Sequence, residues 1–105
     1  MNRSVDSLQI DKLRGEALEQ FFEAILQLEN KEECYQFFDD VATMNEIRSF
    51  AQRFEVANLL YEGKKYTEIE KKTKASTATI SRVSRCLDFG SGGYRLVLDR
   101  MEKEK

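Results

Sequence analysis

Apolar side chains recur at three- and four-residue steps through most of this 105-residue chain, which is the spacing of amphipathic helices. The chain contains no proline and only five glycines, so few residues would interrupt a helix. Its sequence shows no strand-like alternation, no internal repeat and no long linker. We therefore expect an all-α fold in a single domain over residues 1–105.

The periodic segments divide into six helices joined by short loops. The third helix has a capping-box pattern at its start, Thr43 with Glu46, and Gly63 after its end. Ser76 is the expected N-cap of the fifth helix. The expected ranges are about Ser7 or Gln9 to Leu28, Cys34 to Val41, Thr43 to Glu62, Thr67 to Thr73, Thr77 to Asp88, and residues 92–103.

Positive charge is concentrated in one segment, although the whole chain has a net charge of −2. Residues 64–86 carry seven positive and two negative side chains, a net +5, and the rest carries ten positive and 17 negative, a net −7. This asymmetry indicates a basic face on an acidic body, as in proteins that bind nucleic acid. On charge alone, an ordinary solvated, lysine-rich surface is an equally good interpretation of this segment.

Histidine is absent and the two cysteines, Cys34 and Cys86, form no CxxC pair, so we expect no metal site. Both cysteines stand among apolar residues at helical spacing and are expected to be small core side chains. No apolar run reaches the roughly 18 residues of a membrane span, and charges such as Arg3 and Asp6 leave no signal-peptide core. We expect a cytoplasmic protein with no membrane partner.

The segment from Ile69 to Arg85 has the spacing of a helix-turn-helix. Ile69, Ile80 and Val83 would form its core, and Ala75 would fill the space near the turn. The second helix then presents short side chains outward, so its backbone can approach base edges in a DNA major groove. Its N-terminal amides can hold a phosphate. The candidate DNA-binding residues are Lys71, Lys72, Ser76, Thr77, Ala78, Thr79, Ser81, Arg82 and Arg85.

The run "IEKKTKASTATISR", Ile69 to Arg82, resembles the bacterial repressor form of helix-turn-helix, whose recognition helix opens with Ser-x-x-Thr-(Val/Ile)-Ser-Arg. Glu70 stands where a small residue, usually alanine, packs between the two helices of that motif. Lys74 stands where glycine usually makes the turn, and a left-handed lysine there costs about 1 kcal/mol. These two departures bear more on the expected geometry of the turn than on the assignment of the motif.

A wider resemblance covers roughly Gln9 to Met101. "NEIRSFAQRFEVANLLYEG", Asn45 to Gly63, followed by "ATISR", resembles the Trp repressor superfamily, and "ECYQFFDD" and "STATISRV" are similar to its YerC/YecD group. The resemblance implies a six-helix, intertwined homodimer, with the dimer core in residues 7–62, the helix-turn-helix in 66–88 and a C-terminal helix in 92–103. It also implies a bacterial, sequence-specific transcription regulator, expected to be a repressor that binds double-stranded operator DNA.

Trp repressors hold tryptophan between two arginines, and the resemblance makes Arg53 and Arg82 possible effector-binding residues. Next to the second arginine the family has glycine and, three positions later, serine; here these are Val83 and Cys86. Valine adds a branched side chain where the pocket needs space, so tryptophan binding is not expected and no cofactor is assigned. Without an effector, Arg53 would form a surface or interface salt bridge, and Arg82 a phosphate or packing contact.

A second class of function stays open, a protein-interaction module that uses a helix-turn-helix scaffold without binding DNA. No enzyme activity and no catalytic residue are expected, because the chain lacks histidine, a phosphate-binding glycine loop and a nucleophile beside a base. The aromatic content of the N-terminal half favours a homodimer independently, because a small monomer buries a smaller share of its surface. The residues concerned are Phe21, Phe22, Phe37, Phe38, Phe50 and Phe54.

Overall fold

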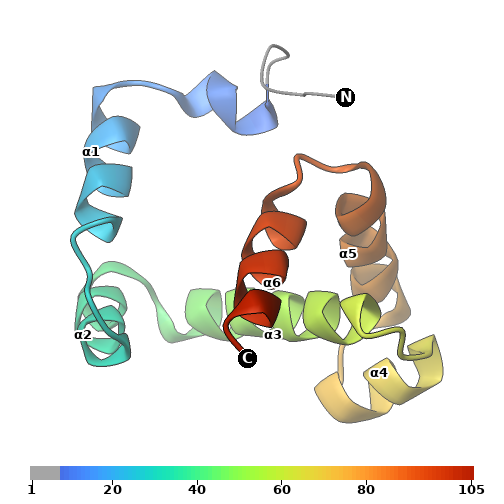
Figure 1. Ribbon diagram of the computed structural model, residues 1–105. Helices are drawn as coiled ribbons and strands as arrows, with labels where there is room; N and C mark the ends of the chain where they lie inside the picture. Colours follow the sequence, from blue (N-terminus) through green and yellow to red (C-terminus); the bar gives the residue numbers. More distant parts are fainter. Residues whose placement is uncertain (1–7) are drawn as a thin grey trace. The chain divides into compact units, whose positions relative to one another are not determined.

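The computed structural model describes residues 8–105, and this part of the chain contains six α-helices, one short 3-10 helix and no strand (Figure 1). The expected start at Ser7, and the charges at Arg3 and Asp6, lie outside the described residues. No helix among residues 8–105 is long and apolar enough to cross a membrane. The elements are η2 (Gln9–Leu13), α1 (Glu16–Ile25), α2 (Lys31–Val41), α3 (Met44–Tyr61), α4 (Tyr66–Thr73), α5 (Thr77–Phe89) and α6 (Gly93–Lys103). The predicted all-α class is confirmed.

The first helix is shorter than predicted, because the segment expected as one helix forms η2 and α1. Arg14 and Gly15 separate the two helices, and within η2 the Asp11 carboxylate accepts from the Leu8 backbone N–H at 2.8 Å and pairs with Arg14 at 2.8 Å. The guanidinium of Arg14 also lowers the pKa of the Asp11 carboxyl. Gly15 then follows in an extended conformation as the N-cap of α1. The periodicity of the apolar residues contains no information on this local side-chain pairing.

The described residues form two compact units, one ending at Met44 and the other running from Asn45 to Lys105. The first holds η2, α1 and α2, and its aromatic rings contact one another: the Phe21 and Phe37 centroids lie 6.0 Å apart. Asn30 caps α2 by accepting from the Glu33 N–H at 2.9 Å. No residue in 8–44 is fully buried within the chain. This unit therefore leaves much of its apolar surface accessible.

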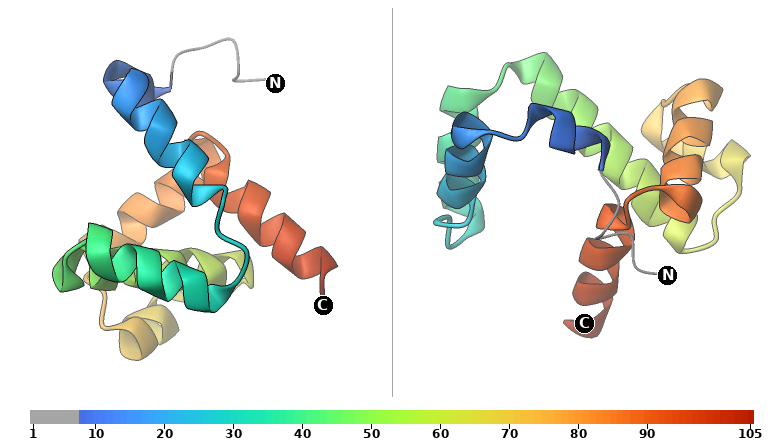
Figure 2. Two further views of the ribbon diagram at one scale, coloured as in Figure 1. Left: turned by 90° about the vertical axis from the view of Figure 1, so that its left-hand side faces the viewer. Right: turned by 90° about the horizontal axis from the view of Figure 1, so that it is seen from above.

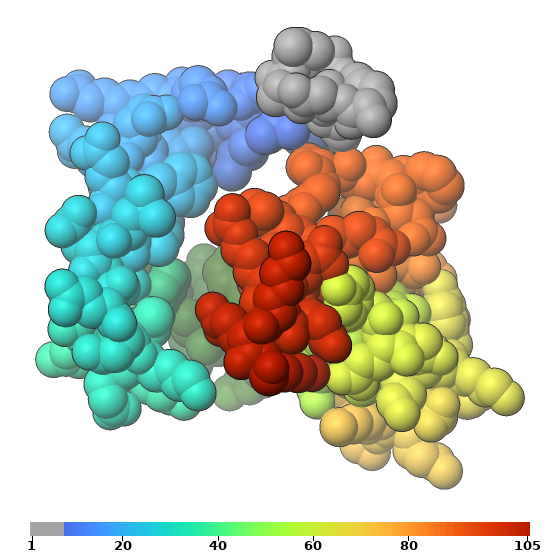
Figure 3. All heavy atoms as spheres, viewed as in Figure 1, coloured from blue at the N-terminus to red at the C-terminus, as the bar shows by residue number. Residues whose placement is uncertain are grey.

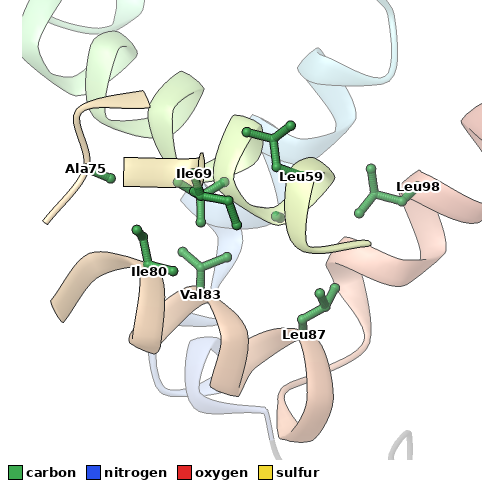
Figure 4. Close-up of a cluster of buried hydrophobic side chains, with 9 residues drawn as sticks. Leu59, Ile69, Ala75, Ile80, Val83, Leu87 and Leu98 are labelled. Carbon is green, nitrogen blue, oxygen red and sulfur yellow. The ribbon is translucent and has the colours of Figure 1, made fainter. Parts of the chain in front are cut away.

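The second unit has a true hydrophobic core, to which α3, α4, α5 and α6 all contribute (Figure 4). Its largest fully buried side chains come from all four helices, and they are Val56, Ile69, Ile80, Val83 and Leu98. Figure 2 shows the chain reversing between α5 and α6. The hydroxyl of Tyr61 on α3 then donates to the Asp99 carboxylate on α6, which raises the pKa of Tyr61. In Figure 3 the side chains of α6 form an exposed surface of this unit.

Both cysteines differ from their predicted core role, because Cys34 and Cys86 are exposed free thiols. The buried residues of α5 are Ile80, Val83 and Leu87, and Cys86 lies outside this stripe. Cys34 belongs to α2, which has no buried residue. Helical spacing alone had grouped each cysteine with its apolar neighbours.

The end of α3 follows the prediction for Gly63, which adopts a φ of +86°. Its N–H donates to the Leu60 carbonyl at 2.9 Å, and the Lys64 N–H donates to the Leu59 carbonyl at 3.0 Å. These two bonds are those of a Schellman motif, in which a left-handed residue after the helix satisfies its last carbonyls. This turn directs the chain from α3 into α4.

Candidate nucleic-acid interface

The two helices α4 and α5 pack against each other around the core predicted for a helix-turn-helix. Ile69 and Ile80 are fully buried, Val83 is 1% exposed and Ala75 is 5% exposed (Figure 4). Ile80 and Val83 hold one face of α5 inward against Ile69 of α4, because burial removes each of these aliphatic side chains from water. The opposite face of α5 is thereby turned to solvent.

The turn between α4 and α5 is built on Lys74, which has the left-handed values φ 62° and ψ 14°. The buried hydroxyl of Thr73 donates to the Ile69 carbonyl at 2.7 Å and accepts from the Ala75 N–H at 3.1 Å. Gln52 on α3 adds a bond from its Nε2 to the Thr73 carbonyl at 3.1 Å. Sequence patterns gave no indication of the parts played by Thr73 and Gln52, because both depend on tertiary contacts.

The start of α5 has the predicted N-cap, since Ser76 Oγ accepts from the Thr79 N–H at 3.1 Å. The Ser76 hydroxyl is also hydrogen-bonded to Thr79 Oγ1 at 3.1 Å. Serine is a favourable N-cap because its oxygen satisfies a backbone donor that has no partner within the helix. The first turn of α5 is therefore fixed by local bonds.

The candidate DNA-binding side chains lie on α4, on α5 and at the N-cap of α5, and all but one are exposed. The exception is Thr79, which is half-buried. The basic residues Lys71 and Lys72 stand on the last turn of α4 and, with Lys64, also line a shallow hollow beside the end of α3. The exposed members of the set are Lys71, Lys72, Ser76, Thr77, Ala78, Ser81, Arg82 and Arg85.

Glu70 links the two helices, because the hydroxyl of Thr77 donates to its carboxylate, with 3.0 Å between Oγ1 and Oε2. Glu70 is half-buried and Thr77 is exposed as the first residue of α5. Glu70, the first residue that departs from the helix-turn-helix pattern, thus forms a polar bond between α4 and α5. The pattern had assigned this position only to packing.

The other end of α5 is held by Arg95 of α6. Its Nε donates to the Leu87 carbonyl at 3.0 Å, and its Nη2 lies 3.3 Å from a carboxylate oxygen of Asp88. A cation at a helix C-terminus is favourable because it interacts with unsatisfied carbonyls and the negative end of the dipole. Gly90 caps the helix through a bond from its N–H to the Cys86 carbonyl at 2.9 Å.

The two arginines considered for an effector have different surroundings. Arg53 is half-buried on α3, donates to Ser49 Oγ at 3.0 Å and lies over the Phe50 ring, 5.1 Å from its centre. Partial burial raises the pKa of the Tyr94 hydroxyl, and the Arg53 guanidinium acts on it in the opposite direction. Arg82 is exposed on α5.

Val83, expected beside the effector pocket, is at the same time a core residue in contact with α4 (Figure 4). Its side chain occupies the interior between the helices of the second unit. Cys86, which stands where the family has serine, is exposed on α5. Among residues 8–105 no group of three or more potential metal ligands occurs.

Comparison with models of known protein families shows to which family the chain is related. The model of the family described as "Trp repressor protein" matches residues 16–102, which include all six α-helices except the end of α6. The chain belongs to the Trp repressor family. Members of this family are DNA-binding regulators rather than enzymes.

Relatives within the Trp repressor family cover nearly the whole chain. The uncharacterized protein YerC of Bacillus subtilis (strain 168) is 58% identical over 96 residues, which are 91% of this chain and 92% of that protein. The crystal structure of a candidate Trp repressor from Staphylococcus aureus is 57% identical, with a TM-score of 0.88 over 91% of this chain and 96% of that one. The crystal structure of a TrpR-like protein from Eubacterium eligens ATCC 27750 is 53% identical, with a TM-score of 0.84 over 88% of this chain and 95% of that one.

Proposed function

We propose that the protein is a sequence-specific regulator of transcription that acts as a repressor in the bacterial cytoplasm by binding double-stranded operator DNA. The observation that carries the proposal is the solvent-facing side of α5, where short side chains lie between exposed cations. Thr77, Ala78 and Ser81 are exposed there, as are Arg82 and Arg85. A helix with short outward side chains can bring its backbone close to base edges in the major groove.

In this proposal α5 is the recognition helix and α4 helps to position it on the phosphates. Lys71 and Lys72, together with Arg82 and Arg85, supply positive charge for phosphate oxygens, which fixes orientation without reading sequence. Thr77 and Ser81 can hydrogen-bond base edges, and the methyl group of Ala78 can contact a thymine methyl. The backbone N–H groups of Thr77 and Ala78, at the start of α5, can provide one more phosphate contact.

The proposal includes a homodimer, in which residues 7–62 contribute to the dimer core. It is supported by the first unit, which has large exposed apolar side chains and no buried residue in 8–44. A two-fold dimer would set two recognition helices about 34 Å apart, one turn of DNA, and would favour a palindromic operator.

The test is DNA binding by Arg85→Ala and Thr77→Ala at several salt concentrations, on a site selected from a random duplex library. Because both residues are exposed, we expect folded variants with weaker binding. Loss of a base contact should cost about 1–3 kcal/mol and relax specificity at one position, whereas loss of a phosphate contact should weaken all sequences alike and flatten the salt slope by about one.

The matched control is Arg100→Ala, which removes the same charge from the exposed face of α6 and should leave affinity for the selected site unchanged. If neither Arg85→Ala nor Thr77→Ala alters affinity, the recognition helix is wrongly assigned. If the unmodified protein retains no DNA even at low salt, it is instead a protein-interaction module on this scaffold, because phosphate contacts always give salt-dependent retention.

A further inference from the structure

We propose that Glu70 and Thr77 form a specificity-determining pair that selects adenine or cytosine, and rejects guanine or thymine, at one position of each half-site. The proposal rests on the DNA-binding function proposed above and deepens it. The observation behind it is the hydrogen bond between these two residues, which lies at the exposed start of the recognition helix.

The direction of this bond is fixed by the chemistry of its partners. An ionised carboxylate can only accept hydrogen bonds, so the bond of 3.0 Å between Thr77 Oγ1 and Glu70 Oε2 must use the single hydroxyl proton of Thr77. The lone pairs of Oγ1 remain available. A threonine that could rotate would donate to one base and accept from another, but this one can only accept.

An outward-facing acceptor distinguishes bases in the major groove. Adenine N6 and cytosine N4 are hydrogen-bond donors there, whereas guanine O6 and N7 and thymine O4 are acceptors. Thr77 Oγ1 can therefore bond to an amino group, while a keto oxygen would face another lone pair. On the strand that Thr77 meets, the expected preference is for adenine or cytosine.

The surrounding structure keeps the pair in place. Ile69 and Ile80 are fully buried and fix α4 against α5, so the positions of Glu70 and Thr77 are set by the core. The neighbouring hydroxyls of Ser76 and Thr79 are not paired with Glu70, because they bond to each other within the first turn of α5. Thr77 is thus an exposed hydroxyl whose donor role is already taken.

The pair also explains why an acidic residue can stand next to a DNA-binding helix. A carboxylate near phosphates is unfavourable on charge alone, since it opposes the attraction of the cations on α4 and α5. Its hydrogen bond to Thr77 gives it a role there, because it sets the hydrogen-bonding direction of a base-contacting side chain. Glu70 acts through Thr77 and is a positioning residue.

The experiment compares the full-length protein with Thr77→Val and Glu70→Gln. For each, bound duplexes are selected from a random library, and affinities are measured for four duplexes that differ only at the position in question. Valine has the shape of threonine without the hydroxyl, and glutamine can donate to Thr77, which frees the threonine proton. Glu62→Gln is the control, because it removes the same charge from an exposed residue beyond the end of α3.

For the unmodified protein we expect adenine or cytosine to be favoured over guanine or thymine by about two- to tenfold, the range for one hydrogen bond. Thr77→Val should remove that preference at one position and leave the rest of the site unchanged. Glu70→Gln should bring guanine and thymine to within about twofold of the amino bases, while Glu62→Gln keeps the original preference. Thermal melting, monitored by circular dichroism, establishes whether each variant is folded. If Thr77→Val does not fold, the result for Glu70→Gln alone tests the pair.

Unchanged preferences in variants that still select the same site would overturn this pair while leaving the DNA-binding function intact. An equal change in Glu62→Gln would also overturn it, since the effect would then come from charge alone. If the unmodified protein selects no sequence at all, the proposed function fails, and the pair fails with it.

Discussion

Lys74 has a backbone conformation that favours glycine, with a φ of 62°, and no other non-glycine residue in 8–105 has a positive φ. At this position the Cβ of an L-residue approaches the neighbouring carbonyl, which costs roughly 1–2 kcal/mol. Thr73 and Gln52 hold the adjacent peptide through their hydrogen bonds, so the turn persists despite that cost. The second departure from the helix-turn-helix pattern is thus tolerated because neighbouring side chains stabilise the turn.

Lys74→Gly should therefore raise the free energy of unfolding, by about 0.5–1 kcal/mol after allowance for the greater freedom of glycine in the unfolded chain. Lys72→Gly is the matched control, because it makes the same change at a helical residue of α4 and should lower stability by a similar amount. Denaturant titration measures both. A lower midpoint for Lys74→Gly would show that the lysine side chain itself stabilises the turn.

At Val83 the structure changes the reason for the expected lack of tryptophan binding. The side chain is 1% exposed and packs in the core, so space for an indole ring would have to be opened inside the second unit. We expect calorimetric titration with L-tryptophan to give no binding. A micromolar dissociation constant would show that a pocket forms around Arg53 and Arg82 all the same. Val83→Gly would leave a cavity and lower stability, so Val83→Ala is the better variant for testing a gain of affinity.

At the scale of the elements, the sequence predicted six helices and the core between α4 and α5, because both depend on apolar spacing and on local caps such as Ser76 and Gly63. It did not predict the break between η2 and α1, where Asp11 pairs locally with Arg14. The contact of Arg95 with the end of α5 was also missed. The Asp11–Arg14 pair is local but forms no part of the apolar periodicity, whereas the partner of Arg95 is set by the tertiary arrangement, which no sequence spacing identifies.

The end of α5 leaves no room for a side chain at Gly90, because an added Cβ would overlap the Cys86 carbonyl oxygen of the same helix. Gly90→Ala should shift the backbone after α5 and lower the free energy of unfolding by about 1–3 kcal/mol. Gly93→Ala is a good comparison, since nothing lies within 4 Å of its added Cβ and its φ is not positive. Equal thermal midpoints for the two variants would contradict this account of the α5 end.

For the whole molecule, the decisive contrast lies between a second unit with a closed core and a first unit without one. Phe22 is 45% exposed and Tyr35 74% exposed, and such surface is costly for a protein that remains a single chain in water. We expect a homodimer at micromolar concentration, with a mass by light scattering about twice the 12.3 kDa of one chain. The melting temperature should rise with protein concentration, because dissociation and unfolding are then coupled. A monomer mass, with a concentration-independent melting temperature, would contradict the dimer.

The hydrogen bond from Gln52 to the Thr73 carbonyl has a consequence for the kinetics of the proposed DNA binding. It joins α3 to the turn before α5, so the recognition helix is already oriented in the free protein. Little rearrangement is then needed after the first encounter with a duplex, and the association rate should be governed by diffusion and charge. Stopped-flow mixing should accordingly show one association phase whose rate increases linearly with DNA concentration. Gln52→Ala, which releases the turn from α3, should add a slower phase that is independent of DNA concentration.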